Sequence, residues 1–384
     1  MTMTDINDAN ISGDCAPGFE ALAEAFENNF KEHGEVGASL CVFQHGKKVV
    51  DLWGGHTDSA RSRPWEKDTL VNVWSTTKGM MALCVARLAD QGILEMERPV
   101  ADYWPEFAAN GKERVTVAQL FSHQAGLCGP DDTVTKEQVL DTDLLGAMLA
   151  AQKPQWPIGE HSGYHAFSIG PLADSLFNRV IGKTVGAYFR DEIAIPFDVD
   201  FHMGLPESED GRVAEIVHDD NPPGGDPEAF TEYQKIAIQH ASLSPYLPNE
   251  RAWRAQGTPS AGGSGNARSI ARIYSALATN RCLGEVEILS EKALEAATEI
   301  QIENEDLVLL FPMSWGIGFA VNKAMGLYGP NPKTFGHHGW GGSFGFADPE
   351  KGLGVAYAMN YMREPLDALD PRIAALTQAI YSSV

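Results

Sequence analysis

The sequence has 384 residues, of which 43% are hydrophobic and 21% charged, a composition that excludes a disordered chain and is typical of a globular protein. Its length exceeds what one simple core needs and predicts two domains, or one domain with a large insertion. The 52 acidic and 29 basic residues give a formal charge of −23, which argues against nucleic-acid and anionic-membrane binding.

The start of the chain is polar and acidic, without the basic and apolar stretches of a secretion signal. No apolar run approaches the roughly 18 residues that cross a membrane. We therefore expect a cytoplasmic protein without membrane insertion. The cysteines are dispersed and form no Cys-x-x-Cys pair, which favours reduced, buried thiols over disulfides or zinc; they are Cys15, Cys41, Cys84, Cys128 and Cys282.

The first elements follow from periodicity. A helical apolar pattern from Phe19 to Phe30 predicts a first helix that ends near Gly34. Residues 38–55 hold two β-rich runs around His45-Gly46, which predicts a hairpin. Residues 61–71 are polar and carry a proline, so we expect a crossover loop there.

Residues 73 to about 250 have a mainly helical pattern with connections rich in proline and glycine. Short helices are expected from Thr116 to His123 and from Leu144 to Gln152. Residues 258–280 then predict a glycine-rich turn and an amphipathic helix, through which the chain returns to the sheet.

The last part of the chain predicts strands at Trp315 to Val321, Gly342 to Ala347 and Leu353 to Met359. The turn-forming residues 348–352 predict an antiparallel hairpin of the last two. A C-terminal helix is expected to present an apolar face made of Leu366, Leu369, Ile373, Leu376 and Ile380.

These elements predict an α+β fold, in which an antiparallel sheet is flanked by helices and carries an inserted all-α domain. Residues 1–72 and 258–384 would form the sheet domain, and residues 73–257 the mainly helical domain. A cleft between the two domains is the expected place for an active site.

Ser75 and Lys78 are three residues apart at the start of a helical pattern, so both lie on one helical face. A serine in the first turn of a helix lies where backbone N–H groups favour negative charge, and a neutral lysine amine can accept its proton. The alternative is a capped helix start with a solvated lysine, because a chain of this length contains roughly one Ser-x-x-Lys by chance.

Tyr164 follows the turn-rich segment 156–163 and is a second candidate. A phenol beside a cationic lysine loses its proton more easily and can relay protons to a leaving group. Alone, a packed amphipathic tyrosine explains the residue as well.

The glycine-dense segment 336–345 lets a substrate approach the backbone. The backbone N–H groups of Trp340 and Ser75 could together form an oxyanion hole, although a tight β-turn also explains the glycines. His337 and His338 are adjacent, so on a strand they point to opposite faces and are poorly placed to share a metal.

Ser343 lies in a Gly-x-Ser-x-Gly motif, but no histidine follows His338, so the α/β-hydrolase triad order cannot be completed. We therefore expect Ser343 to be structural. Further polar residues could line the cleft, although capping or solvation explains each equally well: Asp131, Asp132, His161 and His165.

The order of Ser75-Thr76-Thr77-Lys78, Tyr164 and His337-His338-Gly339 resembles that in the serine β-lactamase and penicillin-binding superfamily. The pattern is most similar to the β-lactamase-like carboxylesterases called family VIII, whose motifs the segments 120–127 and 340–342 also resemble. The resemblance spans about residues 35–365. It implies that Ser75 is acylated, that Lys78 is its base, that Tyr164 shares proton transfer, and that the Ser75 and Trp340 amides bind the oxyanion.

Two departures from the superfamily's pattern concern substrate binding. Tyr164-His165-Ala166 stands in place of Tyr-x-Asn, and His337-His338-Gly339 in place of Lys-Thr-Gly. Alanine cannot hydrogen-bond an amide, and a histidine binds a carboxylate only when it is protonated. The bulky Trp340 would narrow or line the acyl pocket, so each change favours esters over lactams and peptides.

The sequence thus predicts a serine hydrolase of small, short-chain carboxylic esters that needs no metal or cofactor. His337, His338, Gly339 and Trp340 would contact the substrate. Alternatives are an acyltransferase, an amide or β-lactam hydrolase on the same scaffold, or a non-catalytic penicillin-binding-like protein. Apart from a small-molecule ester and a possible second copy of the chain, no partner is expected.

Overall fold

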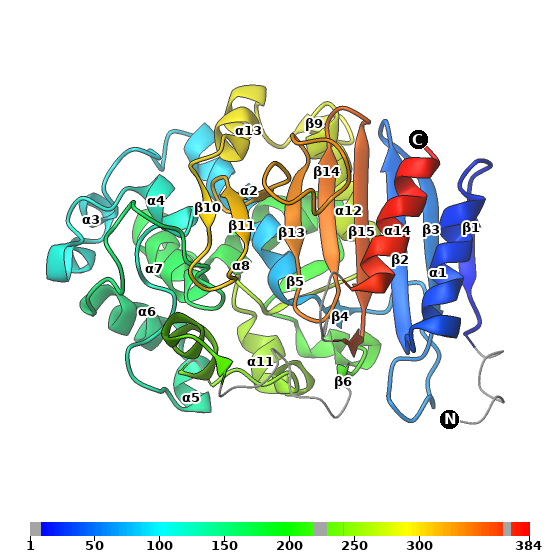
Figure 1. Cartoon of the computed structure of the whole chain (residues 1–384), viewed down its shortest axis with the longest axis horizontal. Coiled ribbons are helices and arrows are strands. Elements are labelled where there is room, and N and C mark those ends of the chain that lie inside the picture. The colour runs from blue at the N-terminus through cyan, green and yellow to red at the C-terminus, as the bar shows by residue number, and fades with distance from the viewer. Residues whose placement is uncertain (1–8, 219–228, 241, 364–369) are drawn as a thin grey trace.

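The computed structural model describes residues 9–218, 229–240, 242–363 and 370–384. Within them, nine strands form one antiparallel sheet (Figure 1). Its order is β1 (Ser12–Cys15), β3 (Lys47–Gly55), β2 (Gly37–Gln44), β15 (Leu353–Met359), β14 (Phe344–Asp348), β13 (Phe335–His338), β12 (Ala320–Val321), β11 (Pro312–Trp315) and β10 (Ile302–Glu305). Strands from both ends of the chain meet where β2 pairs with β15.

The predicted hairpin of residues 38–55 is formed by β2 and β3. His45 and Gly46 both have positive φ, which suits the two-residue turns that match the twist of a hairpin. The register runs from Gln44↔Lys47 to Gly37↔Gly55, with an irregularity between Val42 and Phe43. The hairpin and the predicted strand Leu353–Met359 thus form the middle of the sheet.

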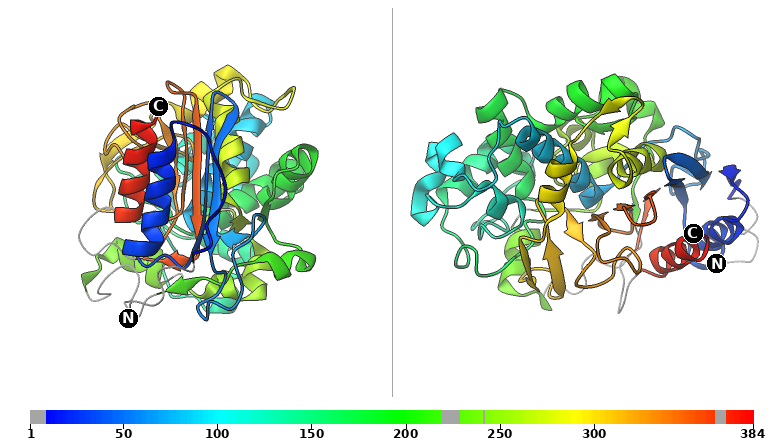
Figure 2. Two further views of the ribbon diagram at one scale, coloured as in Figure 1. Left: turned by 90° about the vertical axis from the view of Figure 1, so that its right-hand side faces the viewer. Right: turned by 90° about the horizontal axis from the view of Figure 1, so that it is seen from above.

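Helices cover both faces of the sheet. Figure 2 shows α1 (Glu20–Glu32) and α14 (Pro371–Ser382) side by side on one face, and α12 (Ala267–Ala278) packs against β2, β14 and β15 on the other. Leu22 and Phe26 of α1 are fully buried, and each such side chain contributes about 1.5–3 kcal/mol by burial. The first helix is where its pattern predicted it.

Most of the regular elements between β3 and α12 are helices, and this part of the chain lies on the far side of the sheet from α1 and α14 (Figures 1 and 2). Its helices are α2 (Thr77–Asp90), α3 (Val100–Tyr103), α4 (Val117–Phe121), α5 (Lys136–Val139), α6 (Thr142–Ala151), α7 (Ile169–Ile181), α8 (Val185–Phe189), α9 (Ile195–Phe197), α10 (Glu232–Gln234) and α11 (Arg251–Gln256).

Short strands interrupt these helices. A small sheet joins β4 (Val71–Asn72), β7 (Gly263–Gly265) and β5 (Phe201–Met203), and β6 (Val217–His218) pairs with β16 (Tyr361–Met362). The segment predicted as helical therefore also holds strands, and β7 lies in the predicted glycine-rich turn. The division into domains at residues 72/73 and 257/258 stays a prediction.

The predicted strand from Trp315 to Val321 was wrong as a single element. The Gly316 amide donates to the Phe319 carbonyl, which closes a turn and makes β11 and β12 two antiparallel strands. The remaining elements are α13 (Glu291–Thr298), β8 (Cys282–Leu283) and β9 (Val286–Glu287). Of the predicted last helix, Leu366 and Leu369 lie outside the described residues, and the rest is α14.

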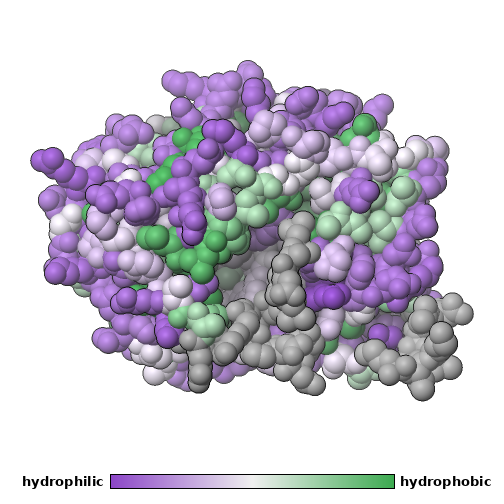
Figure 3. All heavy atoms as spheres, in the orientation of Figure 1, coloured by the Kyte–Doolittle hydropathy of each residue, from purple (hydrophilic) through white to green (hydrophobic). Residues whose placement is uncertain are grey.

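The face of the molecule drawn in Figure 3, in the orientation of Figure 1, is mostly hydrophilic. Apolar side chains gather there near the turn that joins β10 and β11, where Leu310 is 46% exposed. Among the helices that the structure describes, none is long and apolar enough to cross a membrane.

Candidate active site

Ser75 lies in a 3₁₀ turn, Trp74–Thr76, that leads directly into α2. The sequence placed it in the first turn of the α-helix itself, which begins two residues later at Thr77. Trp74 has φ +47, a left-handed conformation that is strained for a bulky residue. Its ring packs against Trp253 and Trp340, with centroid distances of 5.6 and 4.8 Å, and these contacts hold the turn in place.

Lys78 lies fully buried in the first turn of α2, and its Nζ is 3.0 Å from the Ser75 Oγ. The amine also donates to the Ala166 carbonyl at 2.7 Å and to the Ser260 carbonyl at 2.8 Å. Burial lowers the pKa of Lys78 well below its ordinary value, because the partners of the amine are neutral dipoles. The solvated-lysine alternative is therefore wrong.

The bonding capacity of a neutral amine matches this environment. Its two N–H groups donate to Ala166 and Ser260, which leaves the nitrogen lone pair to accept the Ser75 O–H. Once the amine takes that proton, three N–H groups face three oxygen acceptors. The same contacts thus satisfy Lys78 before and after proton transfer.

Tyr164 is buried beside this pair, and the Lys78 Nζ lies 4.8 Å from the centre of its ring. Burial raises the pKa of Tyr164 far above its ordinary value; a hydrogen bond with Ser75 opposes the shift, and Asp306 adds to it. The sequence predicted easier proton loss from a phenol beside a cationic lysine. Desolvation reverses that expectation, since it disfavours both the phenolate and the lysine cation.

The end of β13 brings the predicted His337-to-Trp340 segment to the Ser75 turn. A Cβ on Gly339 would lie 2.1 Å from the Ser343 Oγ and 2.3 Å from the Val73 carbonyl, so only glycine permits this approach. Trp340 lies against Trp74, the residue before Ser75.

The two histidines of the segment separate, as adjacent strand residues do. His337 stacks on Tyr164 at 5.8 Å, whereas the His338 ring contacts Tyr328 and Phe344. Burial lowers the pKa of His337 well below its usual value and that of His338 to about 4, so both rings are neutral at pH 7. Of the two, the structure brings only His337 to Tyr164.

Ser343 is fully buried, and a strand, β14, follows it, not a helix. Its hydroxyl donates to the Val73 carbonyl at 2.8 Å and lies 3.1 Å from the Thr76 hydroxyl. Ser343 thus ties the glycine-rich turn to the Ser75 turn, which is the structural role expected of it.

The other predicted cleft residues differ in their surroundings. His165 is buried between the Gly163 carbonyl and the Leu127 amide, so it fixes the chain and does not line a cleft. His161 and Asp132 are exposed. Asp131 lines a cavity of about 550 Å³ together with Gln155, Glu232, Tyr233, Lys235, Ile236 and His240.

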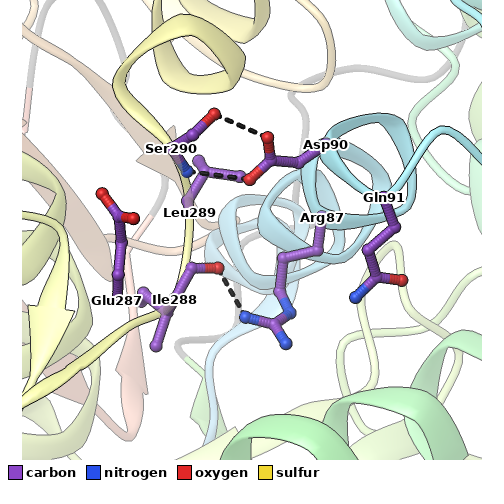
Figure 4. A pocket seen from close by; sticks show the side chains of 7 residues that line it. All are labelled: Arg87, Asp90, Gln91, Glu287, Ile288, Leu289 and Ser290. Carbon is purple, nitrogen blue, oxygen red and sulfur yellow. Dashed lines mark hydrogen bonds between the residues drawn. The ribbon is translucent and has the colours of Figure 1, made fainter.

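A separate polar pocket of about 160 Å³ lies at the other end of α2, about 20 Å along the helix from Ser75. Figure 4 shows Ser290 donating twice to Asp90 and Arg87 donating to the Ile288 carbonyl. These bonds tie α2 to residues 286–290, so the pocket is structural. No group of three or more metal-ligating side chains occurs within the described residues.

Sequence reasoning missed the side chains that surround Tyr164. Trp315 stacks flat on the Tyr164 ring, with a centroid distance of 5.5 Å and an interplanar angle of 1°, and His123 meets its edge. Asp306 is fully buried and hydrogen-bonds both the Tyr164 amide and the Trp315 indole. Only His123 carried a signal, because it lies within the segment 120–127 that shows the resemblance.

A nine-stranded antiparallel sheet with a Ser-x-x-Lys pair at the start of a helix, of which the lysine is buried, defines the β-lactamase-like class of folds. The chain belongs to the Beta-lactamase family, whose model matches residues 22–379. The predicted membership is thereby confirmed, as is the predicted antiparallel sheet flanked by helices; the inserted all-α domain stays a prediction.

Similar proteins support the family over nearly the whole chain. The esterase/beta-lactamase LipL of Mycobacterium tuberculosis is 35% identical over 94% of this chain and 85% of its own. A family VIII carboxylesterase of known crystal structure is 46% identical, with a TM-score of 0.91 over 98% of this chain and all of that one. A penicillin-binding protein homolog from Caulobacter crescentus is 40% identical, with the same TM-score and coverage.

Proposed function

We propose that the protein is a serine hydrolase that cleaves small, short-chain carboxylic esters through an acyl-enzyme on Ser75. The observation that carries the proposal is the 3.0 Å contact between the Ser75 Oγ and the Lys78 Nζ, in which a buried amine of lowered pKa faces a half-exposed hydroxyl. Names of similar proteins, an esterase/beta-lactamase and a family VIII carboxylesterase, agree with it.

In acylation, neutral Lys78 accepts the Ser75 proton while the Oγ forms a bond to the ester carbonyl carbon. The backbone N–H groups of Ser75 and Trp340 stabilise the tetrahedral oxyanion. Its collapse breaks the bond to the alkoxy oxygen, which leaves as an alcohol after receiving the proton from Lys78 through Tyr164. Because its pKa is raised, Tyr164 gives up its own proton only as it receives one.

In deacylation, water takes the place of the alcohol. Lys78 and Tyr164 accept one proton from the water, and the resulting hydroxide attacks the acyl carbon. The bond to the Ser75 Oγ then breaks, the carboxylic acid leaves, and Ser75 recovers a proton from Lys78. The amine returns to its neutral state.

The substrate-facing residues favour esters over β-lactams. A lysine in the superfamily's Lys-Thr-Gly motif would pair with a lactam carboxylate, but this chain has His337, whose pKa burial and the nearby Lys78 hold well below the usual range. Ala166 has no side-chain amide with which to bind a lactam amide. Gly339 and Trp340 complete the proposed binding edge, in which Trp340 limits the acyl group. The His338 ring, predicted to contact the substrate, packs instead against Tyr328 and Phe344.

A Ser75→Ala variant tests the proposal with p-nitrophenyl acetate. Turnover is expected to fall at least ~10⁴-fold, because the atom that forms the acyl-enzyme is lost. A fluorophosphonate probe should label the wild-type protein but not this variant. The matched control is Ser343→Ala, which removes another serine of the same region and should still be labelled; undiminished turnover by Ser75→Ala would refute the assignment.

The alternatives give different outcomes on the same preparation. Nitrocefin turnover that exceeds ester turnover would identify a β-lactamase, and ester products formed with an added alcohol would identify a transferase. A wild-type protein that neither turns over esters nor reacts with the probe would be a non-catalytic binder. The domain division, the cytoplasmic location and a second copy of the chain as partner stay predictions.

A further inference from the structure

The loop between β10 and β11 places a buried carboxylate beside the segment that carries Tyr164. Asp306 is fully buried, and its Oδ1 accepts hydrogen bonds from the backbone amides of Val308 and Leu309, both at 3.0 Å. These two bonds are what a turn-capping aspartate makes. The remaining bonds reach another part of the chain.

The Asp306 Oδ1 also accepts a hydrogen bond, at 2.9 Å, from the backbone amide of Tyr164, which is 142 residues away in the sequence. The Oδ2 accepts from the Ser162 hydroxyl at 2.9 Å and from the Trp315 indole at 3.1 Å. A capped turn needs none of these three bonds. Two of them attach the Tyr164 segment to the carboxylate, and the third attaches the Trp315 ring. The loop also holds this segment through the Leu307 amide, which donates to the Ser162 carbonyl at 2.9 Å.

Trp315 completes the arrangement from the ring side. Its indole lies parallel to the Tyr164 ring, and its N–H is held by Asp306. One carboxylate thus fixes the backbone of Tyr164 directly and its ring through Trp315. Rotation of the ring away from Ser75 would require the indole to move and its buried N–H to lose its acceptor, which costs about 1–3 kcal/mol.

We propose that Asp306 is a positioning residue, which holds the Tyr164 phenol at Ser75 through the Tyr164 amide and the Trp315 ring. The role rests on the proposed function of Tyr164 in proton transfer. Asp306 itself does not touch the substrate. Its effect is therefore expected in kcat, because a phenol misplaced by about 1 Å can cost on the order of 100-fold in rate.

Asp306→Asn is a sharp test because it changes one acceptor into a donor. If the amide oxygen stays toward Tyr164, the new NH₂ group faces the Trp315 N–H, and two donors meet. The Ser162 hydroxyl adapts, since it can donate to the Asn304 Oδ1 at 2.9 Å and accept from the NH₂ group. Trp315→Phe removes the opposing donor and keeps an aromatic ring over Tyr164.

The measurements are kcat and KM with p-nitrophenyl acetate, the melting temperature, and the ¹³C NMR signal of ζ-labelled Tyr164, assigned with Tyr164→Phe. Asp306→Asn should lower kcat about 10- to 100-fold, leave KM within about threefold, and shift or broaden the Tyr164 signal. Adding Trp315→Phe should restore part of kcat and of the signal. Trp315→Phe alone, which leaves Asp306 its other donors, should lower kcat less.

The matched control is Asp348→Asn. Asp348 is also fully buried and accepts from Asn331, from the Tyr381 hydroxyl and from the amides of Glu350 and Lys351, in the β14–β15 turn. It should lose stability while kcat and the Tyr164 signal stay unchanged.

Three outcomes would overturn the proposal: wild-type kcat with an unmoved Tyr164 signal in Asp306→Asn, an equal kcat loss in Asp348→Asn, or no recovery in the double variant. If Asp306→Asn does not fold, the Trp315→Phe variant alone tests the proposal. An unchanged Tyr164 NMR signal in that variant would count against it. If the wild-type protein neither hydrolyses esters nor reacts with the fluorophosphonate probe, the proposed function is refuted instead. The NMR signal of Tyr164 would then still show whether Asp306 holds the Tyr164 ring in place.

Discussion

Lys78 and Arg372 are both fully buried, yet the protein surrounds them in opposite ways. The Lys78 amine meets two carbonyls and one hydroxyl, and burial lowers its pKa. Arg372 donates to the carboxylates of Glu35 and Asp370, both at 2.7 Å. Burial alone would lower the pKa of Arg372, but Glu35, Tyr357 and Asp370 outweigh it and raise it.

The two environments suit the two side chains to different roles. A buried cation without a counter-charge gives up its proton, which suits a base, whereas a paired arginine keeps its charge and fixes geometry. Arg372 also donates to the Gly341 carbonyl at 2.7 Å, and thereby joins the C-terminal helix to the turn after Trp340. The active-site edge is thus held by a permanent charge, and proton transfer is left to a neutral amine.

The largest effect is expected from removing the neutral amine. Lys78→Met should lower turnover of p-nitrophenyl acetate about 10³- to 10⁴-fold, because Ser75 loses its base while the site keeps a side chain of similar length. Lys78→Arg should be equally inactive, since a guanidinium does not accept a proton. Circular dichroism checks the fold, and activity of Lys78→Arg within about tenfold of wild type would contradict a role as base.

The next effect is on stability and comes from the other cation. Arg372→Met should lower the free energy of unfolding by about 3–5 kcal/mol, because it leaves the Glu35 and Asp370 carboxylates buried without their cation. Adding Glu35→Gln should recover part of the loss, and Arg372→Lys, which keeps the charge but not the fork, should fall between. Urea unfolding measures this series; a cost below about 1 kcal/mol for Arg372→Met would show that the network is not holding the fold.

Lys78 also shows which features of the site could be predicted from the sequence and which could not. Spacing alone placed Ser75 and Lys78 on one face, because contacts three residues apart are set by local geometry. That Lys78 is buried among carbonyls from residues 166 and 260 is a tertiary fact without a local signal. The same holds for Tyr164, for which the residues alone left a packed tyrosine as an equal explanation until the resemblance favoured a catalytic role. Its pKa shift was predicted with the wrong sign, because the sequence does not show that the ring is buried.

In the fold, too, the elements with a local sequence signal were predicted and the others were missed. The hairpin of β2 and β3 and the strand β15 were found because a β-rich composition and turn residues mark them locally. The edge strand β10, Ile302–Glu305, was missed because its sequence is mostly polar and its side chains alternate between half-buried and exposed. Asp306, at the end of that strand, resembles an ordinary turn aspartate, and its partners Ser162 and Tyr164 are remote in sequence.

Asp174 provides the smallest test, since it is a buried acid to which the described part of the chain offers no paired cation. Burial raises its pKa to about 7, a bond from the Val185 amide opposes the shift, and Asp143 adds to it. The fold therefore favours the protonated acid. That stabilisation is complete below the ordinary pKa of 3.8 and is lost as the pH rises through about 7.

Asp174→Asn mimics the protonated acid and can still accept the Val185 N–H. It should match the wild type near pH 4 and become the more stable of the two as the pH rises through about 7, as measured by urea unfolding between pH 4 and pH 8. Asp200 is the control of opposite sign: burial raises its pKa, but bonds from His202 and Arg212 outweigh this and lower it to about 2. Asp200→Asn should be less stable than the wild type at pH 7, and the difference in stability should narrow toward pH 2. If the stability of the two variants followed the same pH trend, counter-charges would not decide which of these carboxyl groups keeps its proton.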